Sequence, residues 1–339
     1  MWRALIPLGI ALTATGCGSY VARRIVQAPN TYPSWLAPQA RVFLAFDDKL
    51  LTHFPPREIE VGPPAARLQY RIIPPADYRL TVTCSNWTTG RHERAQYNFD
   101  AAVPGATNTW SESPRGTVVL LHGYGEAQFT MLPWALLLAE HGWQTVLVDL
   151  RGHGASSGKQ IFFGVREAND LCELLDELTR RAAAPAPVAV LGESYGAALA
   201  LRWKAADPRV GRVIAIAPYA VLSNAVLNIC AEYAPCLPRI FPKAGLKQLP
   251  RILGVEPAEL NPIAVLARDP VAALFIAGTE DDIAPPADVC ALFAQAAPRS
   301  TLLTIACATH ETLPYHFDEL TQPVLDWLAD QPASPPGGR

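Results

Sequence analysis

Residues 188–200 have the sequence VAVLGESYGAALA, in which Gly192-Glu193-Ser194-Tyr195-Gly196 fits the pattern G-x-S-x-G. The pattern follows an apolar run and opens a helical stretch, so it predicts a tight turn between a buried strand and a helix. Glycine stands on both sides of the serine because neighbouring side chains would clash in such a turn. The turn would hold the Ser194 hydroxyl at a helix N-terminus, where backbone N–H groups favour developing negative charge. We therefore interpret Ser194 as a nucleophile, and the alternative is a strand-to-helix turn with an incidental serine.

Short apolar runs alternate with helical stretches from residue 117 onward. The expected strands are 117–122, 145–149, 188–191, 212–217, 272–277 and 301–306. The expected helices are 129–141, 165–184, 195–206, about 286–297 and 317–329. Near-continuous apolar runs are typical of parallel strands buried on both faces, and their alternation with helices predicts an α/β fold with a mostly parallel sheet covered by helices on both sides.

Further motifs follow the expected strands. His122-Gly123-Tyr124-Gly125-Glu126 follows the first strand, and DLRGHGAS, residues 149–156, follows the second. The sequence GTEDDIAP, residues 278–285, comes after the fifth strand. A serine nucleophile also needs a base, and the chain beyond Ser194 contains only two histidines, His310 and His316.

These motifs together resemble the α/β-hydrolase superfamily, and more narrowly its monoglyceride lipase, lysophospholipase and serine aminopeptidase group. The resemblance covers roughly residues 115–330. It implies the α/β-hydrolase fold and a catalytic triad in the chain order serine, acid, histidine. On this chain the triad is Ser194, Asp281 and His310, with Asp282 and Glu280 as alternatives for the acid. His316, just before the last expected helix, is interpreted as a surface or capping residue.

The resemblance also implies an oxyanion hole. The residue after His-Gly and the residue after the nucleophile supply its backbone N–H groups, which on this chain are Tyr124 and Tyr195. His122 and the 149–156 loop, with His153, are expected to be structural. Gly192 and Gly196 complete the turn around the nucleophile.

The segments outside the motifs predict the domain organisation. Residues 17–112 carry strand-like alternation at 66–73 and 78–87, which we interpret as a β extension packed on one edge of the sheet, with a separate small domain as the alternative. Residues 113–330 form the hydrolase domain. Its stretch at about 218–268 is too long for a simple crossover, so we expect a lid there. The Pro- and Gly-rich residues 331–339 predict a disordered tail.

The N-terminus reads as a targeting segment, residues 1–16. A short apolar run ends in Ala14-Thr15-Gly16-Cys17, which resembles the lipobox of bacterial lipoproteins, although those sequences prefer leucine or another aliphatic residue at the position of Ala14. We expect lipidation at Cys17 and membrane attachment in a bacterial cell envelope, facing the periplasm. An ordinary cleaved signal peptide and a cytoplasmic enzyme are the alternatives. Six other cysteines permit disulfides, and Cys230 and Cys236 are close enough to pair.

Composition limits the function classes. The net charge is −3 and no basic stripe is present, so nucleic acid is not an expected partner. No metal, nucleotide or flavin motif is present, and we expect no cofactor. A triad predicts acyl transfer to water, and the apolar lid favours lipid-like or other apolar esters. Peptidase, thioesterase and acyltransferase activity are the alternatives, and a non-catalytic envelope binding protein is a further one. The physiological substrate, the acyl chain length and the oligomeric state do not follow from the sequence.

Overall fold

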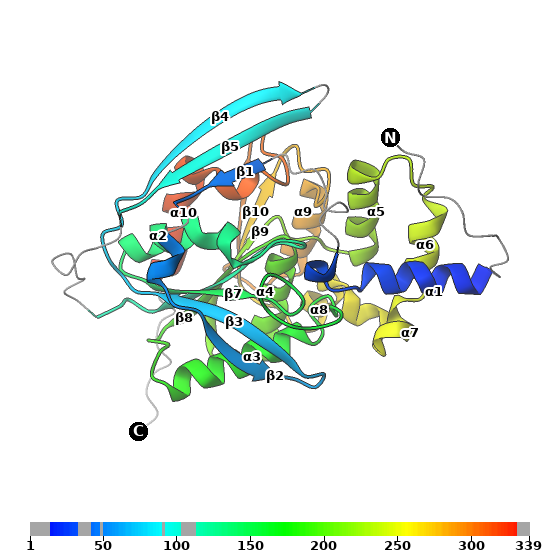
Figure 1. Ribbon diagram of the computed structural model, residues 1–339, viewed down its shortest axis with the longest axis horizontal. Coiled ribbons are helices and arrows are strands. Elements are labelled where there is room, and N and C mark those ends of the chain that lie inside the picture. The colour runs from blue at the N-terminus through cyan, green and yellow to red at the C-terminus, as the bar shows by residue number, and fades with distance from the viewer. Residues whose placement is uncertain (1–13, 33–41, 48–49, 90–91, 103–112, 331–339) are drawn as a thin grey trace.

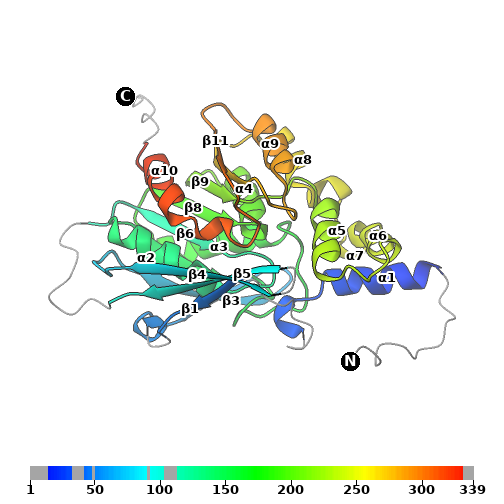
Figure 2. The ribbon, with the colours of Figure 1, turned by 90° about the horizontal axis from the view of Figure 1, so that it is seen from above.

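The computed structural model describes residues 14–32, 42–47, 50–89, 92–102 and 113–330. Eight strands of this part form one sheet with the order β11-β10-β9-β8-β6-β7-β3-β2, and Figures 1 and 2 together label all of them. Their bounds are β2 Arg57–Val61, β3 Ala66–Ile73, β6 Thr117–Leu121, β7 Gln144–Asp149, β8 Val188–Glu193, β9 Val210–Ile216, β10 Leu274–Gly278 and β11 Thr301–Ile305. The strands from β7 to β11 are parallel, whereas β3 and β2 add antiparallel at the β7 edge. This is the mostly parallel sheet that the sequence predicts.

Helices cover both faces of the sheet. They are α2 Leu132–Glu140, α3 Glu167–Arg180, α4 Tyr195–Ala206, α9 Pro286–Gln295 and α10 Phe317–Ala329. Helix α2 connects β6 to β7 on one side, whereas α3 and α4 lead to β8 and then β9 on the other side of β6. Because crossovers between parallel strands are right-handed, α2 lies on the opposite face of the sheet from α3 and α4. The indole N–H of Trp134 in α2 donates to the carbonyl of Pro314 at 2.9 Å, which ties α2 to the start of α10.

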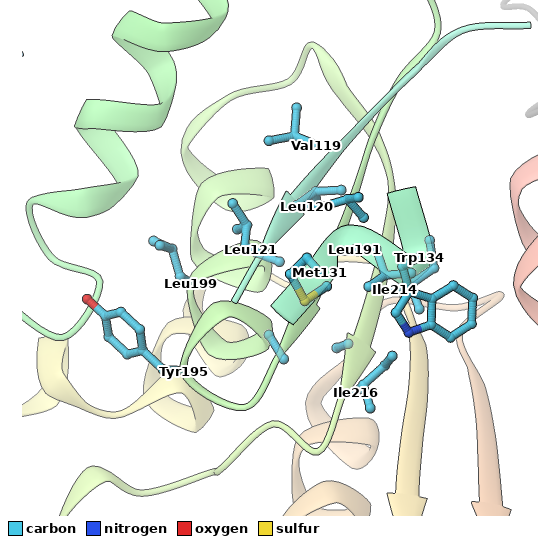
Figure 3. Close-up of a cluster of buried hydrophobic side chains, with 14 of the residues drawn as sticks. Val119, Leu120, Leu121, Met131, Trp134, Leu191, Tyr195, Leu199, Ile214 and Ile216 are labelled. Atoms are coloured by element: carbon cyan, nitrogen blue, oxygen red, sulfur yellow. The ribbon is translucent and has the colours of Figure 1, made fainter. Parts of the chain in front are cut away.

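The core lies between the sheet and these helices. Every residue of β6 and of β8 is buried. Figure 3 draws Leu120 and Leu121 of β6 together with Met131, Trp134 and Leu191 in one cluster of buried hydrophobic side chains. Burial on both faces of the strands explains why their sequences are continuous apolar runs rather than alternating ones.

Several predicted boundaries are right and several are wrong. The bounds of α4, α10 and β3 agree with the prediction. The expected helix at 129–141 is instead a 3₁₀ turn, Gln128–Met131, followed by α2, whose second residue is proline. The expected strand at 78–87 begins later, because Arg79 has a positive φ of 51°; β4 spans Thr81–Thr89.

The N-terminal extension differs in part from the prediction. Strands β2 and β3 lie on the edge of the large sheet, as expected. However, β1 Val42–Ala45, β4 and β5 His92–Asp100 form a second, three-stranded sheet with the order β1-β5-β4. Tyr97 and Phe99, on one face of β5, contact Tyr315 and Phe317 beyond the large sheet. The second sheet thus packs on the segment that follows His310.

A helical lobe lies at one end of the molecule in both views (Figures 1 and 2). It contains α1 Ala14–Ile25 together with α5 Leu222–Tyr233, α6 Ile240–Leu246 and α7 Leu249–Leu253 from the predicted lid. Helix α8 Pro262–Arg268 follows and packs on α4 and α9. Within the described residues, no helix combines the length and hydropathy that a membrane crossing requires.

Cys230 and Cys236, which are close enough in sequence to form a disulfide, are not bonded to each other. The six described cysteine side chains are all free thiols, including Cys230 in α5 and the exposed Cys236 after it. The side chain of Cys17 lies outside the described residues, although its backbone is part of α1.

Candidate active site

Ser194 occupies the turn between β8 and α4, where the sequence places it. Its backbone has φ 50° and ψ −107°, a conformation that is strained for a residue with a side chain. The Ser194 N–H donates to the carbonyl of Ile216 at 2.8 Å, which holds the turn against the neighbouring strand β9. A hydrogen bond to the sheet therefore holds the strained turn in place, and Ser194 directly precedes helix α4.

The flanking glycines are required by close backbone contacts. A Cβ atom on Gly192 would lie 2.3 Å from the carbonyl oxygen of Gly196. A Cβ atom on Gly196 would lie 2.2 Å from the carbonyl oxygen of Leu121 in β6. Neither position can hold a side chain without moving the backbone, which is the physical reason for the G-x-S-x-G pattern.

His310 and Asp281 meet Ser194 in a continuous hydrogen-bonded chain. The Nε2 atom of His310 lies 2.9 Å from the Ser194 Oγ, and its Nδ1 lies 2.8 Å from the Asp281 Oδ2. Since an ionised carboxylate only accepts, Nδ1 carries the proton and Nε2 is free to accept the Ser194 hydroxyl. The structure thus brings together the three residues that the sequence singles out, at the carboxyl ends of parallel strands.

The tertiary structure distinguishes Asp281 from its neighbours. Asp281 is buried, and its Oδ1 accepts the N–H groups of Ile283 and Ala284 at 2.9 and 2.7 Å. Glu280 and Asp282 are exposed. His316 occupies the N-cap position of α10 without a side-chain capping hydrogen bond, its Nδ1 lies 3.6 Å from Glu319, and among the described residues no hydrogen bond joins it to Ser194.

The two predicted oxyanion donors have free backbone N–H groups. Among the hydrogen bonds of the described residues, none is donated by the backbone N–H of Tyr124 or of Tyr195. The N–H of Gly123, in contrast, donates to Glu126 at 3.0 Å. The loop after β6 is therefore held by Gly123, and the N–H of Tyr124 remains available to a ligand.

The two histidines predicted to be structural are unsuited to act as bases. Burial lowers the pKa of His122 to about 4 and the pKa of His153 to about 3. The Nε2 of His122 accepts the N–H of Leu150 at 3.1 Å, and its Nδ1 donates to the carbonyl of Gly123. His122 thereby joins the β6 loop to the β7 loop.

The 149–156 loop is a scaffold in the structure. The carboxylate of Asp149 accepts the backbone N–H of Gln128 at 2.7 Å and that of Ala155 at 2.9 Å. Arg151 forms a buried two-point ion pair with Asp170 of α3, at 2.7 and 2.6 Å. These bonds lock the loop to the sheet and to α3.

Two glutamates lie near the site, the half-buried Glu126 and the buried Glu193, and the sequence motifs assigned no role to either. Glu126 accepts Gly123 N–H and the Thr130 hydroxyl, both at 3.0 Å. Glu193, directly before the nucleophile, is buried, and its Oε2 has no hydrogen-bond partner. Burial raises the pKa of both carboxyls, and it raises the pKa of Glu193 well above its ordinary value, with the charge of nearby Glu126 adding to the shift. Both carboxyls therefore take up a proton more readily than an exposed glutamate does.

Helix α5 of the predicted lid touches both loops that carry the acid and the base. The Asn228 side chain donates to the carbonyl of Ile283 at 3.1 Å, two residues after Asp281. The Tyr233 hydroxyl donates to Glu311, the residue after His310. The position of α5 is therefore coupled to the geometry of the His310–Asp281 pair.

Comparisons with known proteins agree with this fold. A model of the serine aminopeptidase family S33 matches residues 112–270, a range that contains Ser194 and ends before Asp281 and His310. An uncharacterized protein of Bacillus subtilis is 30% identical over 173 residues, which are 50% of this chain. The match spans 56% of that protein's length, so this chain covers little more than half of the curated relative.

Solved structures show the same fold at low identity. An esterase from Pyrococcus furiosus superposes with a TM-score of 0.59 at 18% identity, over 83% of this chain and 93% of that one. A hydrolase from Pseudomonas aeruginosa superposes with a TM-score of 0.53 at 19% identity, over 81% and 98% of the two chains. The protein has the α/β-hydrolase fold, with an additional small sheet from its N-terminal part.

Proposed function

We propose that the protein is a serine hydrolase that cleaves carboxylic esters, lipid-like or with other apolar acyl groups, through an acyl-enzyme. The observation that carries this proposal is the hydrogen-bonded chain from Ser194 Oγ through His310 to Asp281. A chain of this kind lets an imidazole take the serine proton while the carboxylate holds the ring in the required tautomer. A serine hydroxyl without such a base is a weak nucleophile.

The first half of the reaction would transfer the acyl group to the enzyme. The Ser194 Oγ attacks the ester carbonyl carbon as its proton moves to His310 Nε2, and the carbonyl oxygen becomes an oxyanion. The N–H groups of Tyr124 and Tyr195 are free to donate to that oxyanion, and one such donor is worth roughly 10²–10³ in rate. The tetrahedral intermediate collapses, His310 gives its proton to the leaving alcohol, and the acyl group remains on Ser194.

The second half would return the enzyme to its starting state. A water molecule gives a proton to His310 Nε2 and attacks the acyl carbonyl. The second tetrahedral intermediate expels the Ser194 oxygen, which recovers the proton, and the carboxylic acid leaves. The Asp281 carboxylate accepts two backbone N–H groups besides the His310 ring, and these bonds hold it in place through both halves of the reaction.

The substrate class rests on the lid and on the comparisons. Helix α5 of the predicted lid is mostly apolar, and it reaches the loops that carry the acid and the base. An apolar helix at this side of the site favours a substrate with an acyl chain over one with a charged group. The structurally similar Pyrococcus furiosus protein is an esterase by name. Both points support ester hydrolysis without naming the acyl group.

Peptide hydrolysis is the second candidate, since the matching family model describes a serine aminopeptidase. Aminopeptidases need a carboxylate to bind the substrate amine. Of the lid carboxylates, Glu259 is engaged by Arg202 at 2.8 Å and by Arg268. Glu256 is exposed on the outer turn before α8. These placements disfavour Glu256 and Glu259 as the carboxylate that binds the substrate amine, and Glu232, the third lid carboxylate, is half-buried on α5.

Labelling by a fluorophosphonate probe tests for an activated serine without a guess at the substrate. We expect the wild type to be labelled and Ser194→Ala to be unlabelled, with Ser223→Ala as a matched control that keeps its labelling. A panel of p-nitrophenyl esters of increasing chain length, run beside aminoacyl p-nitroanilides, then separates esterase from peptidase. Labelling of the Ser194→Ala variant, or no labelling of a folded wild type, would refute the proposal.

We propose in addition that Cys17 carries lipid and anchors the protein in a bacterial cell envelope. The proposal rests on the Ala14–Cys17 sequence. It fits the position of α1, because Gly18 packs against Ala244 of α6 and a chain that begins at Cys17 keeps this contact. Cys17→Ser should move the protein from the membrane fraction to the soluble fraction of cells. An unchanged distribution would contradict the anchor.

A further inference from the structure

A cavity in the helical lobe lies away from the catalytic residues. It is about 720 Å³ in volume and lies between α5 and the region of α6. Leu227, Ile240 and Leu246 line it together with Arg239, Lys243 and Lys247, and neither Ser194, Asp281 nor His310 does. We call this cavity the α5–α6 groove. Its α6 wall is held in place from behind, where Gly245 packs closely on Val21 and Ala22 of α1.

The α5–α6 groove carries concentrated positive charge in a protein whose net charge is −3. Arg239, Lys243 and Lys247 recur every four residues, all three are exposed, and residues 237–255 contain no aspartate or glutamate. None of the three is in an ion pair within the described residues. Elsewhere, Arg202 and Arg209 are paired with carboxylates. The groove cations thus lack the internal partners that other arginines of this protein have.

Exposed apolar side chains accompany these cations. Ile240 is 71% exposed, Leu237 is 42% exposed and Phe241 is 39% exposed. Large apolar side chains left in water next to lysine and arginine are typical of surfaces that lie in the interface of a membrane, where the cations meet lipid phosphates and the apolar groups enter the acyl boundary.

We propose that the α5–α6 groove docks the protein on a membrane surface by binding an anionic phospholipid. Arg239, Lys243 and Lys247 contact the phosphate groups, and Ile240 enters the acyl boundary. A soluble polyanion would use the cations but not the exposed Ile240, and an acidic protein partner would not depend on a bilayer. The groove requires neither ester hydrolysis nor lipid on Cys17. It does lie in the same lobe as α1, so an anchor at Cys17 would bring the groove to the membrane.

Vesicle sedimentation tests the proposal in the full-length chain. Every protein in the test carries Cys17→Ser, so that lipidation does not contribute. Vesicles contain either phosphatidylcholine alone or phosphatidylcholine with about 30% phosphatidylglycerol. Each cation near an anionic membrane strengthens binding about fivefold. The triple variant Arg239→Gln/Lys243→Gln/Lys247→Gln loses three such cations, so we expect its partition to the anionic vesicles to be roughly 100-fold weaker. Ile240→Ser should weaken partition even though it leaves the charge unchanged.

A matched control removes the same charge elsewhere. Arg57, Arg79 and Arg299 are exposed and lie on other parts of the chain, and their replacement by glutamine gives the same net charge as the groove variant. We expect this control to bind the anionic vesicles nearly as well as the parent. Unfolding curves and fluorophosphonate labelling establish that each variant is folded.

Three results would overturn the proposal. Equal partition to the two kinds of vesicle would remove the role of anionic lipid. An equal loss in the control triple variant would mean that overall charge, and not the groove, drives binding. Retained binding by the groove triple variant would show that Arg239, Lys243 and Lys247 do not hold the protein on the vesicles.

Discussion

The carboxyl group of Glu193 allows the electrostatics under the nucleophile to be tested by one isosteric change, Glu193→Gln. Glu193 is only 5% exposed, its Oε2 has no partner, and Glu126 is close by. Burial therefore raises the pKa of Glu193 well above its ordinary value of 4.5 in the folded protein. Glutamine has the shape of the protonated acid, so the folded variant keeps the packing and loses only the ionisable group.

The sign of the effect follows from proton binding. Above pH 4.5 the unfolded chain releases the Glu193 proton, whereas the folded protein retains it up to the raised pKa. The folding free energy from this group is therefore fully present below pH 4.5 and declines as the pH rises. The decline is about 1.4 kcal/mol for each pH unit, and the glutamine variant has no such decline. Between pH 5 and pH 7, the stability of the variant should therefore rise relative to that of the wild type, by at most about 1.4 kcal/mol for each pH unit over which folded Glu193 keeps its proton.

Urea unfolding followed by tryptophan fluorescence at pH 5, 6 and 7 measures this difference. Glu280→Gln is the control, because its side chain is exposed and lacks the burial that drives the effect. A difference between variant and wild type that does not change with pH would refute the reasoning. It would mean that Glu193 is ionised in the folded protein at neutral pH.

Three further changes test other parts of the site. Gly196→Ala should destabilise the fold by more than about 3 kcal/mol in thermal unfolding, because its Cβ would lie 2.2 Å from a backbone carbonyl oxygen. Gly125→Ala should cost only about 1 kcal/mol, because its Cβ would meet nothing within 4 Å and only the positive φ is unfavourable. Equal costs for the Gly196→Ala and Gly125→Ala variants would count against the steric argument. His153→Phe should cost about 1 kcal/mol of stability at neutral pH. Because the pKa of His153 is lowered to about 3 in the folded protein, protonation between pH 6.5 and pH 3 favours the unfolded chain, and the variant should lose less stability than the wild type in that window. An unchanged acid unfolding midpoint would contradict this. Tyr233→Phe should lower kcat/KM for esters by up to about tenfold with labelling of Ser194 retained, and no change in kcat/KM would separate α5 from the catalytic loops.

The sequence alone determined the parts of this protein that depend on short stretches of chain. The run of apolar residues before Ser194, with glycines on both sides, predicts the turn because a tight strand-to-helix junction excludes side chains within a few residues. The same local logic predicts α4 and α10 with their observed bounds. The order of the motifs then pointed to His310 and to a choice among Glu280, Asp281 and Asp282.

The tertiary structure decided what depends on residues far apart in the chain. Of the acid candidates, only Asp281 is buried against His310, and burial follows from how two loops meet. Glu126 and Glu193 come from different strand ends, so no local pattern predicts that they share one site. The second sheet and the contact of α1 with α6 likewise join segments with no common periodicity. The spacing of apolar side chains indicates which face of a helix or strand is apolar, but only the tertiary structure determines which other element covers that face.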